Sequence, residues 1–285
     1  AYRLSAYMYK DKDSEDGRLT MGPIWDYNLA FGNADYYDGW DPAGWQLDVE
    51  LGGDPFKIPF WWYRIWDDET FRDAFNQRWQ ELRQTVFSEE YIMNMIDSTI
   101  AVIDEAQVRN FQRWSNNQPR FGSYQGEINH LKDWLATRLN WMDGRFAPRP
   151  ATNRNPGIYP SGTTVTLSAP LGGNQKIYYT LDGSRPGTGT SVYSGPITIQ
   201  NTSVLKARSM EYDMLPGEIV TATYFIDEQS FLPTVSLVAE PETLWDADIG
   251  IYENEYKQRE IPVRIEYFTP DTDHGFSVNA GARLG

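Results

Sequence analysis

The stretch GPIWDYNLAFGN, residues 22–33, places a single carboxylate, Asp26, between a tryptophan and a tyrosine. Asp26 follows an apolar run that is predicted to be a β-strand and precedes a predicted turn. An acid among aromatic side chains is costly unless a cation or hydrogen-bond donors compensate its charge. The stretch therefore indicates that Asp26 either binds a cation or caps the turn by accepting backbone N–H groups.

The composition is that of a large, globular, acidic protein. A length of 285 residues, with 40% hydrophobic and 15% aromatic residues, predicts two or three packed domains. The formal net charge of −15 argues against nucleic acid as a partner, and no apolar run is long enough to predict a membrane span. Because cysteine is absent, disulfides, thiolate nucleophiles and Cys-zinc sites are excluded. This composition favours a bacterial extracellular or cell-surface protein.

Residues 1–147 are predicted to form a β-hairpin followed by helices. Alternating runs at 1–9 and 18–25 flank a polar turn, which is typical of a hairpin. Three apolar stripes with spacings of three and four follow, with Ser88 as a predicted N-cap and Gly144 as a predicted helix end. The stripes are Phe71, Phe75, Trp79, Leu82 and Val86, preceded by Asp67, Asp68 and Glu69; Ile92, Met95, Ile96, Thr99, Ile103 and Ala106; and Ile128, Leu131, Leu135, Leu139 and Met142.

The second half of the chain is predicted to be β-structure. A stretch rich in proline and asparagine, 148–157, reads as a linker. In 158–227, short β-prone runs alternate with glycine and proline turns, the pattern of a small antiparallel sandwich. Residues 232–285 add strands that are expected at 234–239, 262–268 and 275–284. Since Ala1 is not a natural start and Gly285 falls in an apparent strand, we expect the chain to be part of a longer polypeptide.

These stretches resemble known families. The hairpin, the 22–33 block and the helices that follow resemble, in this order, the C-terminal half of the spore-coat protein H (CotH) kinase family over about residues 1–146. The strings YYTLDGSRP and LKARSM are similar to the chitobiase/β-hexosaminidase C-terminal-type domain, an immunoglobulin-like sandwich. Residues 232–285 resemble the strand-rich region that normally precedes a CotH core. The expected fold class is therefore multidomain α+β and all-β: a kinase-like C-lobe portion, a sandwich and a β-rich partial domain.

The resemblance implies a role for Asp26. Its place is similar to that of the metal-binding aspartate of protein kinases, which holds Mg²⁺ against the phosphates of ATP. The implied cofactors are Mg²⁺ or Mn²⁺ with ATP, and the implied acceptor is a protein hydroxyl. The amide oxygen of Asn28 is a second candidate ligand, since residues two apart on an extended segment face the same side. Family members often carry an acid at that position, so the amide lowers the charge of the ligand set.

The same resemblance places the catalytic-loop aspartate, the phosphate-binding basic residue and the nucleotide-binding lobe ahead of Ala1. We therefore expect residues 1–285 alone to be inactive, and the parent protein to transfer phosphoryl groups from ATP to protein. The alternative is a non-catalytic extracellular protein that is structural, adhesive or carbohydrate-binding and contacts a cell surface or a polysaccharide.

Weaker signals lie elsewhere. The acids of 11–17 are crowded enough for Ca²⁺ but miss the EF-hand spacing, which favours a solvated hairpin turn. In 33–48, acids alternate with aromatic residues, so this loop is either a carbohydrate cleft or an ordered cover of the helical lobe. Of Tyr178 and Tyr179, one must face outward, as a sugar contact or on a spacer module. The loop residues are Asp35, Asp38, Asp41 and Asp48, with Tyr36, Tyr37, Trp40 and Trp45.

His130 and His274 are the only histidines. One lies beside the apolar stripe of a predicted helix and the other in a polar turn. They therefore assemble neither a zinc cluster nor a Ser-His-Asp triad.

Overall fold

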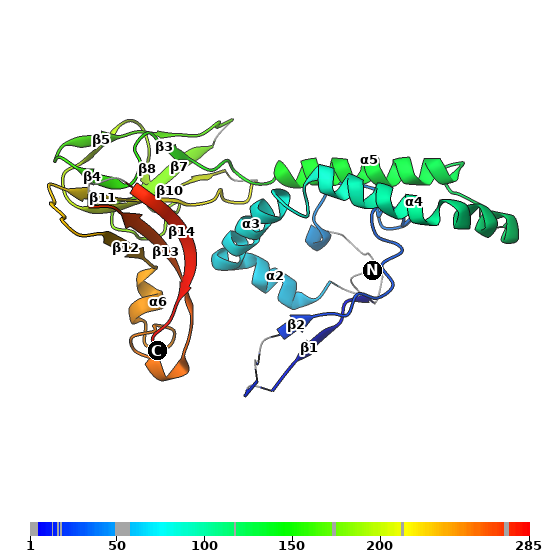
Figure 1. The fold of residues 1–285 in the computed structure, drawn as a ribbon, viewed down its shortest axis with the longest axis horizontal. Coiled ribbons are helices and arrows are strands. Elements are labelled where there is room, and N and C mark those ends of the chain that lie inside the picture. Colours follow the sequence, from blue (N-terminus) through cyan, green and yellow to red (C-terminus); the bar gives the residue numbers. More distant parts are fainter. Residues whose placement is uncertain are drawn as a thin grey trace. The chain divides into compact units, whose positions relative to one another are not determined.

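The computed structural model describes most of the chain. The described residues are 5–12, 14, 15, 17, 19–48, 58–116, 118–172, 175–211, 214–270 and 274–285, with the side chain of His274 excepted. They divide into two compact units, Ala1–Arg145 and Phe146–Gly285. Unit 1 is mainly helical and unit 2 is built from β-sheets (Figure 1), which confirms the predicted fold class.

Unit 1 opens with the predicted hairpin, but its strands are shorter than expected. Strand β1 (Met8–Lys10) pairs antiparallel with β2 (Leu19–Met21), with Met8 opposite Met21. Strand β2 ends there because Pro23 follows closely and has no N–H to donate to a partner strand. The sequence predicted Asp26 at the end of this strand. In the structure, Asp26 lies five residues beyond it.

The three predicted helices are confirmed. The structure also contains a helix that was not predicted, α2 (Phe60–Asp67). The other elements are η1 (Gln46–Asp48), α3 (Glu69–Arg83), α4 (Glu89–Arg113) and α5 (Tyr124–Asp143). The Asp68 carboxylate caps α3 by accepting from the amides of Thr70 (2.7 Å) and Phe71 (3.0 Å), and Ser88 caps α4 as predicted. Gly144 ends α5 with φ −71°, so it stops the helix without the left-handed conformation that usually favours glycine there.

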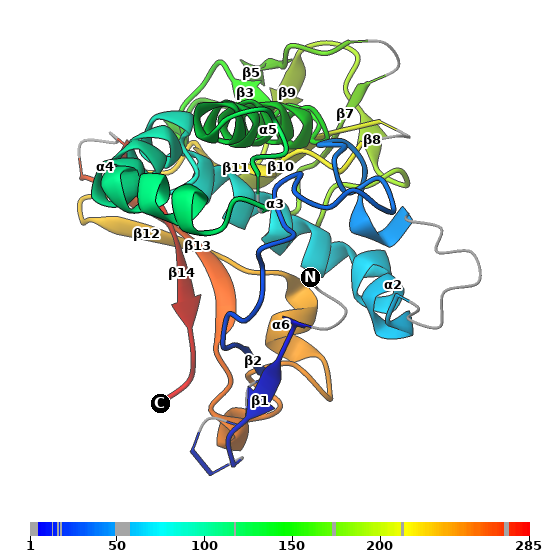
Figure 2. The ribbon, with the colours of Figure 1, turned by 90° about the vertical axis from the view of Figure 1, so that its right-hand side faces the viewer.

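Helices α4 and α5 lie side by side in both views (Figures 1 and 2). Asp97 of α4 and Lys132 of α5 form an ion pair at 2.5 Å. The aromatic residues that the sequence assigned to packing do pack, since Trp45 contacts the rings of Trp66 and Trp141 at centroid distances of 5.1 Å each. A shared aromatic cluster therefore joins the loop before α2 to α2 and α5.

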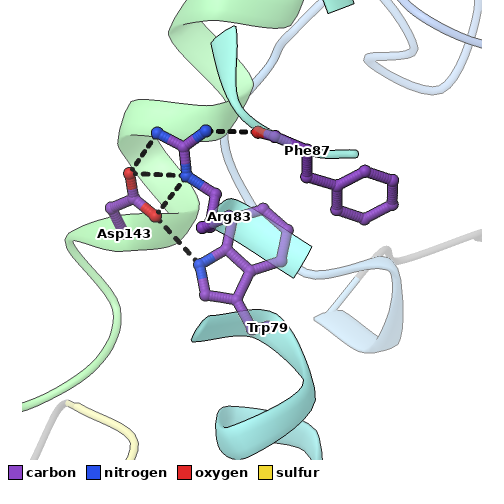
Figure 3. A network of polar contacts seen from close by, with 4 residues as sticks. All are labelled: Trp79, Arg83, Phe87 and Asp143. Atoms are coloured by element: carbon purple, nitrogen blue, oxygen red, sulfur yellow. Dashed lines mark hydrogen bonds and ion pairs between the residues drawn. The ribbon is translucent and has the colours of Figure 1, made fainter. Parts of the chain in front are cut away.

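A polar network fixes α3 to the last residue of α5 (Figure 3). Trp79 Nε1 donates to Asp143 Oδ1 at 2.9 Å, and Arg83 Nη2 donates to Asp143 Oδ2 at 2.9 Å. Arg83 also donates to the backbone oxygen of Phe87, beyond the end of α3. One carboxylate thus accepts from an indole and a guanidinium that lie about one helical turn apart.

Unit 2 is an immunoglobulin-like sandwich with a further sheet packed against it. Its strands are β3 (Ala151–Thr152), β4 (Gly157–Tyr159), β5 (Thr163–Val165), β6 (Leu167–Ser168), β7 (Lys176–Thr180), β8 (Ser191–Val192), β9 (Ile197–Ile199), β10 (Ser203–Met210) and β11 (Val220–Ile226). A five-stranded sheet has the order β4-β11-β10-β7-β8, and β5-β9 and β3-β6 form two short pairs. Leu205, Ala222 and Tyr224 of the large sheet pack with Val165 and Ile199 in the core.

The remaining strands, β12 (Thr234–Val238), β13 (Ile261–Phe268) and β14 (His274–Ala282), form an antiparallel sheet near the predicted positions. This sheet lies beside β10 and β11 in both views (Figures 1 and 2). The rings of Phe225 and Phe268 meet edge to face at 5.4 Å, and Glu266 Oε2 accepts from the amide of Thr223 at 2.8 Å. The outer face of β10 and β11 is therefore covered rather than solvated.

The proposed division into domains at 158–227 and 232–285 stays a prediction, but both segments belong to one compact unit here. The segment 148–157, predicted to be a linker, contains strand β3, which pairs with β6. Just before it, Ala147 is buried and its amide donates to Leu215 O at 2.9 Å. Prolines and asparagines here mark short paired segments of unit 2 rather than a free connection.

Replacing Asp143 with alanine removes the acceptor shared by Trp79 and Arg83. The Arg83 side chain is only 19% exposed, so its charge would lose its partner in a poorly solvated place. We expect the free energy of unfolding of unit 1 to fall by about 2 kcal/mol. Urea denaturation followed by tryptophan fluorescence measures this change, because ten of the eleven tryptophans lie in unit 1.

The matched control is Glu81→Ala. Glu81 pairs with Arg78 on the surface of the same helix, with side chains 51% and 67% exposed. Its loss should change stability by less than about 0.5 kcal/mol. Equal effects of the two substitutions would show that the network at Asp143 does not hold α3 to α5.

Candidate functional site

Asp26 is exposed, and its carboxylate is not used in capping. Its backbone has φ 57°, in the left-handed region, and its carbonyl oxygen accepts from Ser5 Oγ at 3.3 Å. Residues 27–33 are all described, and no amide among them donates to the carboxylate; their turns are closed by backbone bonds such as Ala30 N to Tyr27 O at 2.9 Å. Within the described part of the chain, the Asp26 carboxylate thus has no hydrogen-bond donor.

Asn28 is also exposed, but the geometry predicted for the pair is wrong. The prediction that Asp26 and Asn28 face the same side assumed an extended segment. The left-handed backbone of Asp26 and the turn that starts at Asn28 break that extension. The carbonyl oxygen of Asn28 accepts from Asn33 Nδ2 at 2.7 Å, which ties the two ends of the turn together.

The loop that carries Asp26 is anchored on helix α5 through Gly32. Gly32 has φ +82°, and an added Cβ would lie 2.4 Å from Trp134 Cδ1 and 2.9 Å from His130 Nε2. Phe31 meets the Trp134 ring at 6.0 Å, edge to face, and His130 Nε2 lies 3.4 Å from Gly32 O. A residue other than glycine has no room here, so the backbone itself contacts the helix.

Basic and aromatic side chains extend this anchor along the loop. Arg120 Nη1 donates to Asn33 O at 3.2 Å, and Trp134 Nε1 donates to Trp40 O at 2.9 Å. Arg138 Nη1 reaches two further carbonyl oxygens, those of Pro42 (2.8 Å) and Gly44 (2.7 Å). Burial lowers the pKa of Arg138 below its usual value, and the charge of Asp41 opposes that shift. The guanidinium stays charged at neutral pH, which strengthens both bonds.

Sequence reasoning did not identify these anchors as a group. It placed His130 beside an apolar stripe and gave no role to Trp134 and Arg138. The available signal is their spacing, because residues four apart share one face of a helix. In the structure that face contacts the loop at residues 32–44.

The aromatic loop at 33–48 is an ordered cover rather than a cleft. Trp45 packs inside the cluster described above, and Asp41 Oδ1 accepts from Ala43 N at 2.8 Å within the loop. Tyr36, Tyr37 and Trp40 remain about half exposed. Two open depressions of about 340 and 580 Å³ occur in unit 1, but their linings include neither Asp26 nor Asn28. The linings are Thr85, Val86, Ser88, Glu90, Tyr91 and Asn94, and Trp61, Arg64, Ile65, Asp68, Thr70, Phe71 and Ala74.

The donors at the site suit a hard cation only in part. Among the described residues, no three His, Cys, Asp or Glu side chains gather closely enough to hold a metal ion. Asp26 offers one anionic oxygen ligand with no competing donor in the described ranges. Mg²⁺ commonly uses one or two carboxylates and completes its shell with water and phosphate oxygens. Asp26 therefore fits a metal that is shared with a nucleotide, and not a metal held by protein side chains alone.

The other predicted candidates are less suited to a site. Asp13 and Asp16 of the 11–17 turn lie outside the described residues. Tyr179 packs against the sandwich core and Tyr178 is half-buried, so neither ring is fully open to a sugar. The His130 ring stacks on Phe121 at 3.8 Å. None of the helices in the described part has the length and apolar character of a membrane span.

Two parts of the chain match known families. Residues 1–142 match the CotH kinase protein family. Residues 154–221 match the chitobiase/beta-hexosaminidase C-terminal domain, so the predicted order of the two modules is confirmed. A search of the curated proteins finds no match. The CotH segment contains Asp26, the anchored loop and all of α5 except its last residue.

The anchor of the CotH segment makes a steric prediction. Gly32→Ala places a Cβ against Trp134 in a backbone conformation that alanine rarely adopts, so we expect the loop to detach from α5. Hydrogen exchange of the amides of residues 27–44 should accelerate at least tenfold.

The control is Gly44→Ala. Gly44 also has positive φ (+85°), but an added Cβ meets nothing within 4 Å. Both variants carry the backbone strain, and only Gly32→Ala carries the clash. Similar exchange in the two variants would contradict the contact with α5 as the cause.

Proposed function

We propose that the CotH segment belongs to a phosphoryl-transfer site in which Asp26 binds a divalent metal held against the phosphates of ATP. The observation that carries this proposal is an exposed carboxylate with no donor among the described residues, on a loop whose other end is fixed to a helix. A cap or a structural ion pair would engage the carboxylate within the fold. A carboxylate that binds an external cation, in contrast, keeps its oxygens free of hydrogen bonds from the protein.

The chemistry needs little else from Asp26. Transfer of a terminal phosphoryl group depends on positioning and on neutralising negative charge. A bound Mg²⁺ or Mn²⁺ would supply that neutralisation, and the carboxylate would fix the cation on the protein. The anchors on α5 hold the loop and thereby limit the movement of Asp26. Asn28 is proposed as an auxiliary ligand through its amide oxygen, which requires a side-chain orientation different from the extended one first expected.

We also propose the phosphoryl acceptor, the source and the location of the protein. The acceptor is a protein hydroxyl, and the parent protein is bacterial and acts outside the cell or on its surface. The family model and the chitobiase-type domain support this location, as does a cysteine-free acidic composition.

Residues 1–285 alone are proposed to be inactive, because the resemblance provides no catalytic-loop aspartate within them. An in vitro assay of this chain with radiolabelled ATP and Mn²⁺ should show no incorporation above background.

The test of the metal site is Asp26→Asn in the protein at its natural full length. The substitution keeps the shape of the side chain and removes its charge. We expect the affinity for Mn²⁺·ATP, measured by isothermal titration calorimetry, to fall at least tenfold, while the melting temperature stays within about 2 °C because the carboxylate has no structural partner in the described residues.

The control is Asp104→Asn, an exposed acid on helix α4, which should leave the affinity unchanged. Asn28→Ala should give an intermediate loss. If Asp26→Asn and Asp104→Asn bind Mn²⁺·ATP equally well, Asp26 is not the metal ligand. A loss of folding in Asp26→Asn alone would instead support a structural role.

A further inference from the structure

Exposed aromatic rings occur close together in the sequence outside the CotH segment, between residues 245 and 256. Trp245 is the only tryptophan after residue 141, and its side chain is 60% exposed. Its ring stacks on that of Tyr252 at 4.5 Å with an interplanar angle of 14°, and Tyr252 is itself 50% exposed. Tyr256, nearby in sequence, is 74% exposed. We call these three residues the aromatic platform; their exposure means that core packing does not explain them.

The backbone beneath the platform is firmly held. Helix α6 (Pro241–Trp245) is joined to the following segment by Ile251 N to Thr243 O (2.9 Å) and Tyr252 N to Leu244 O (3.0 Å). Ile251 is buried in a small core with strand β13. The rings are therefore presented by an ordered segment, and a ligand would not have to order it on binding.

A buried asparagine braces the turn between the rings. Asn254 is 4% exposed, and its Nδ2 donates to Ala247 O and Gly250 O at 3.0 Å each. These bonds add to the backbone bond from Asn254 N to Gly250 O at 3.0 Å. The structure keeps Tyr252 and Tyr256 on either side of one fixed residue.

The rim of the platform is charged. Asp246 Oδ1 accepts from Asp248 N (2.9 Å) and Ile249 N (3.0 Å), and these bonds hold the pKa of Asp246 below its usual value. Lys257 Nζ lies 5.7 Å from the centre of the Tyr256 ring. The exposed acids in the same stretch of the chain are Glu242, Asp246, Asp248, Glu253 and Glu255.

We propose that the aromatic platform binds a neutral polysaccharide chain. The flat, apolar C–H face of a pyranose ring stacks on an exposed aromatic face, and its hydroxyls donate to carboxylates such as Asp246 and accept from Lys257. The acidic rim and the net charge of −15 disfavour anionic ligands. The same rim disfavours a protein partner, since the centres of protein interfaces are depleted in charged residues. This proposal is independent of Asp26 and of ATP.

The test is affinity gel electrophoresis of the 285-residue chain in gels containing xylan, hydroxyethylcellulose or glycol chitin. At least one of these neutral polysaccharides should retard the protein. Trp245→Ala and Tyr256→Ala should each raise the apparent Kd at least tenfold. Tyr252→Phe, which keeps the ring, should change it less than threefold. Phe231→Ala removes a ring that is 86% exposed elsewhere in unit 2 and should have no effect.

Two controls keep the result interpretable. Trp245→Ala removes part of the stack and must keep the thermal unfolding profile of the original chain; if it does not, Tyr256→Ala decides, because that side chain is the most exposed. Absence of retardation in all three gels overturns the proposal, as does retardation that both alanine variants retain. Sedimentation velocity that shows a self-associated chain, dissociated by Tyr256→Ala and without any polysaccharide binding, would assign the platform to a protein contact instead.

Discussion

The close approach of the backbone at Gly32 to helix α5 is the constraint on which the candidate site depends. A positive φ and a missing side chain allow the carbonyl of Gly32 to reach His130 and its Cα to lie against Trp134. Beyond Gly32 the loop contacts α5 again at Trp40, Pro42 and Gly44, whose carbonyls accept from Trp134 and Arg138. Asp26 lies just ahead of this fixed segment. Its exposure is therefore a property of an anchored loop, and not of a loose end.

The helices could be predicted to the extent that their signals are local. Asp68 and Ser88 cap the helices that follow them, and each cap depends on residues within three positions. Helix α2 escaped prediction for the same reason, since Pro59 precedes it without any side-chain cap. Gly144 shows the limit of this reasoning. The residue ends its helix as predicted, but with an ordinary helical φ, so the choice of glycine does not come from the conformation that usually explains it.

The site was only partly predictable. Asp26 could be found because an acid between aromatic residues breaks the local pattern. Its relation to Asn28 could not, since the assumed strand stops at Met21 and the backbone at Asp26 is left-handed. The contacts that hold the loop join residues about 90 positions apart, as in Arg120 to Asn33 and Arg138 to Gly44. Spacing within α5 marks Trp134 and Arg138 as donors, but only the fold identifies Arg120 and the carbonyls that the three residues reach.

Strand β10 has the sequence pattern of a half-solvated strand, but both of its faces are buried. Its alternation of Leu205, Lys206, Ala207 and Arg208 is typical of a strand with one solvated face. Yet Lys206 and Arg208 are 6% and 1% exposed, because β12 and β13 cover that face. A buried ammonium requires a partner, and Glu240, just after β12, accepts from Lys206 Nζ at 2.6 Å. The chitobiase-type match ends at Thr221, before this partner occurs in the sequence. The buried ammonium of Lys206 therefore has its partner outside the matched domain, and the last segment of the chain forms part of the environment in which that sheet is stable.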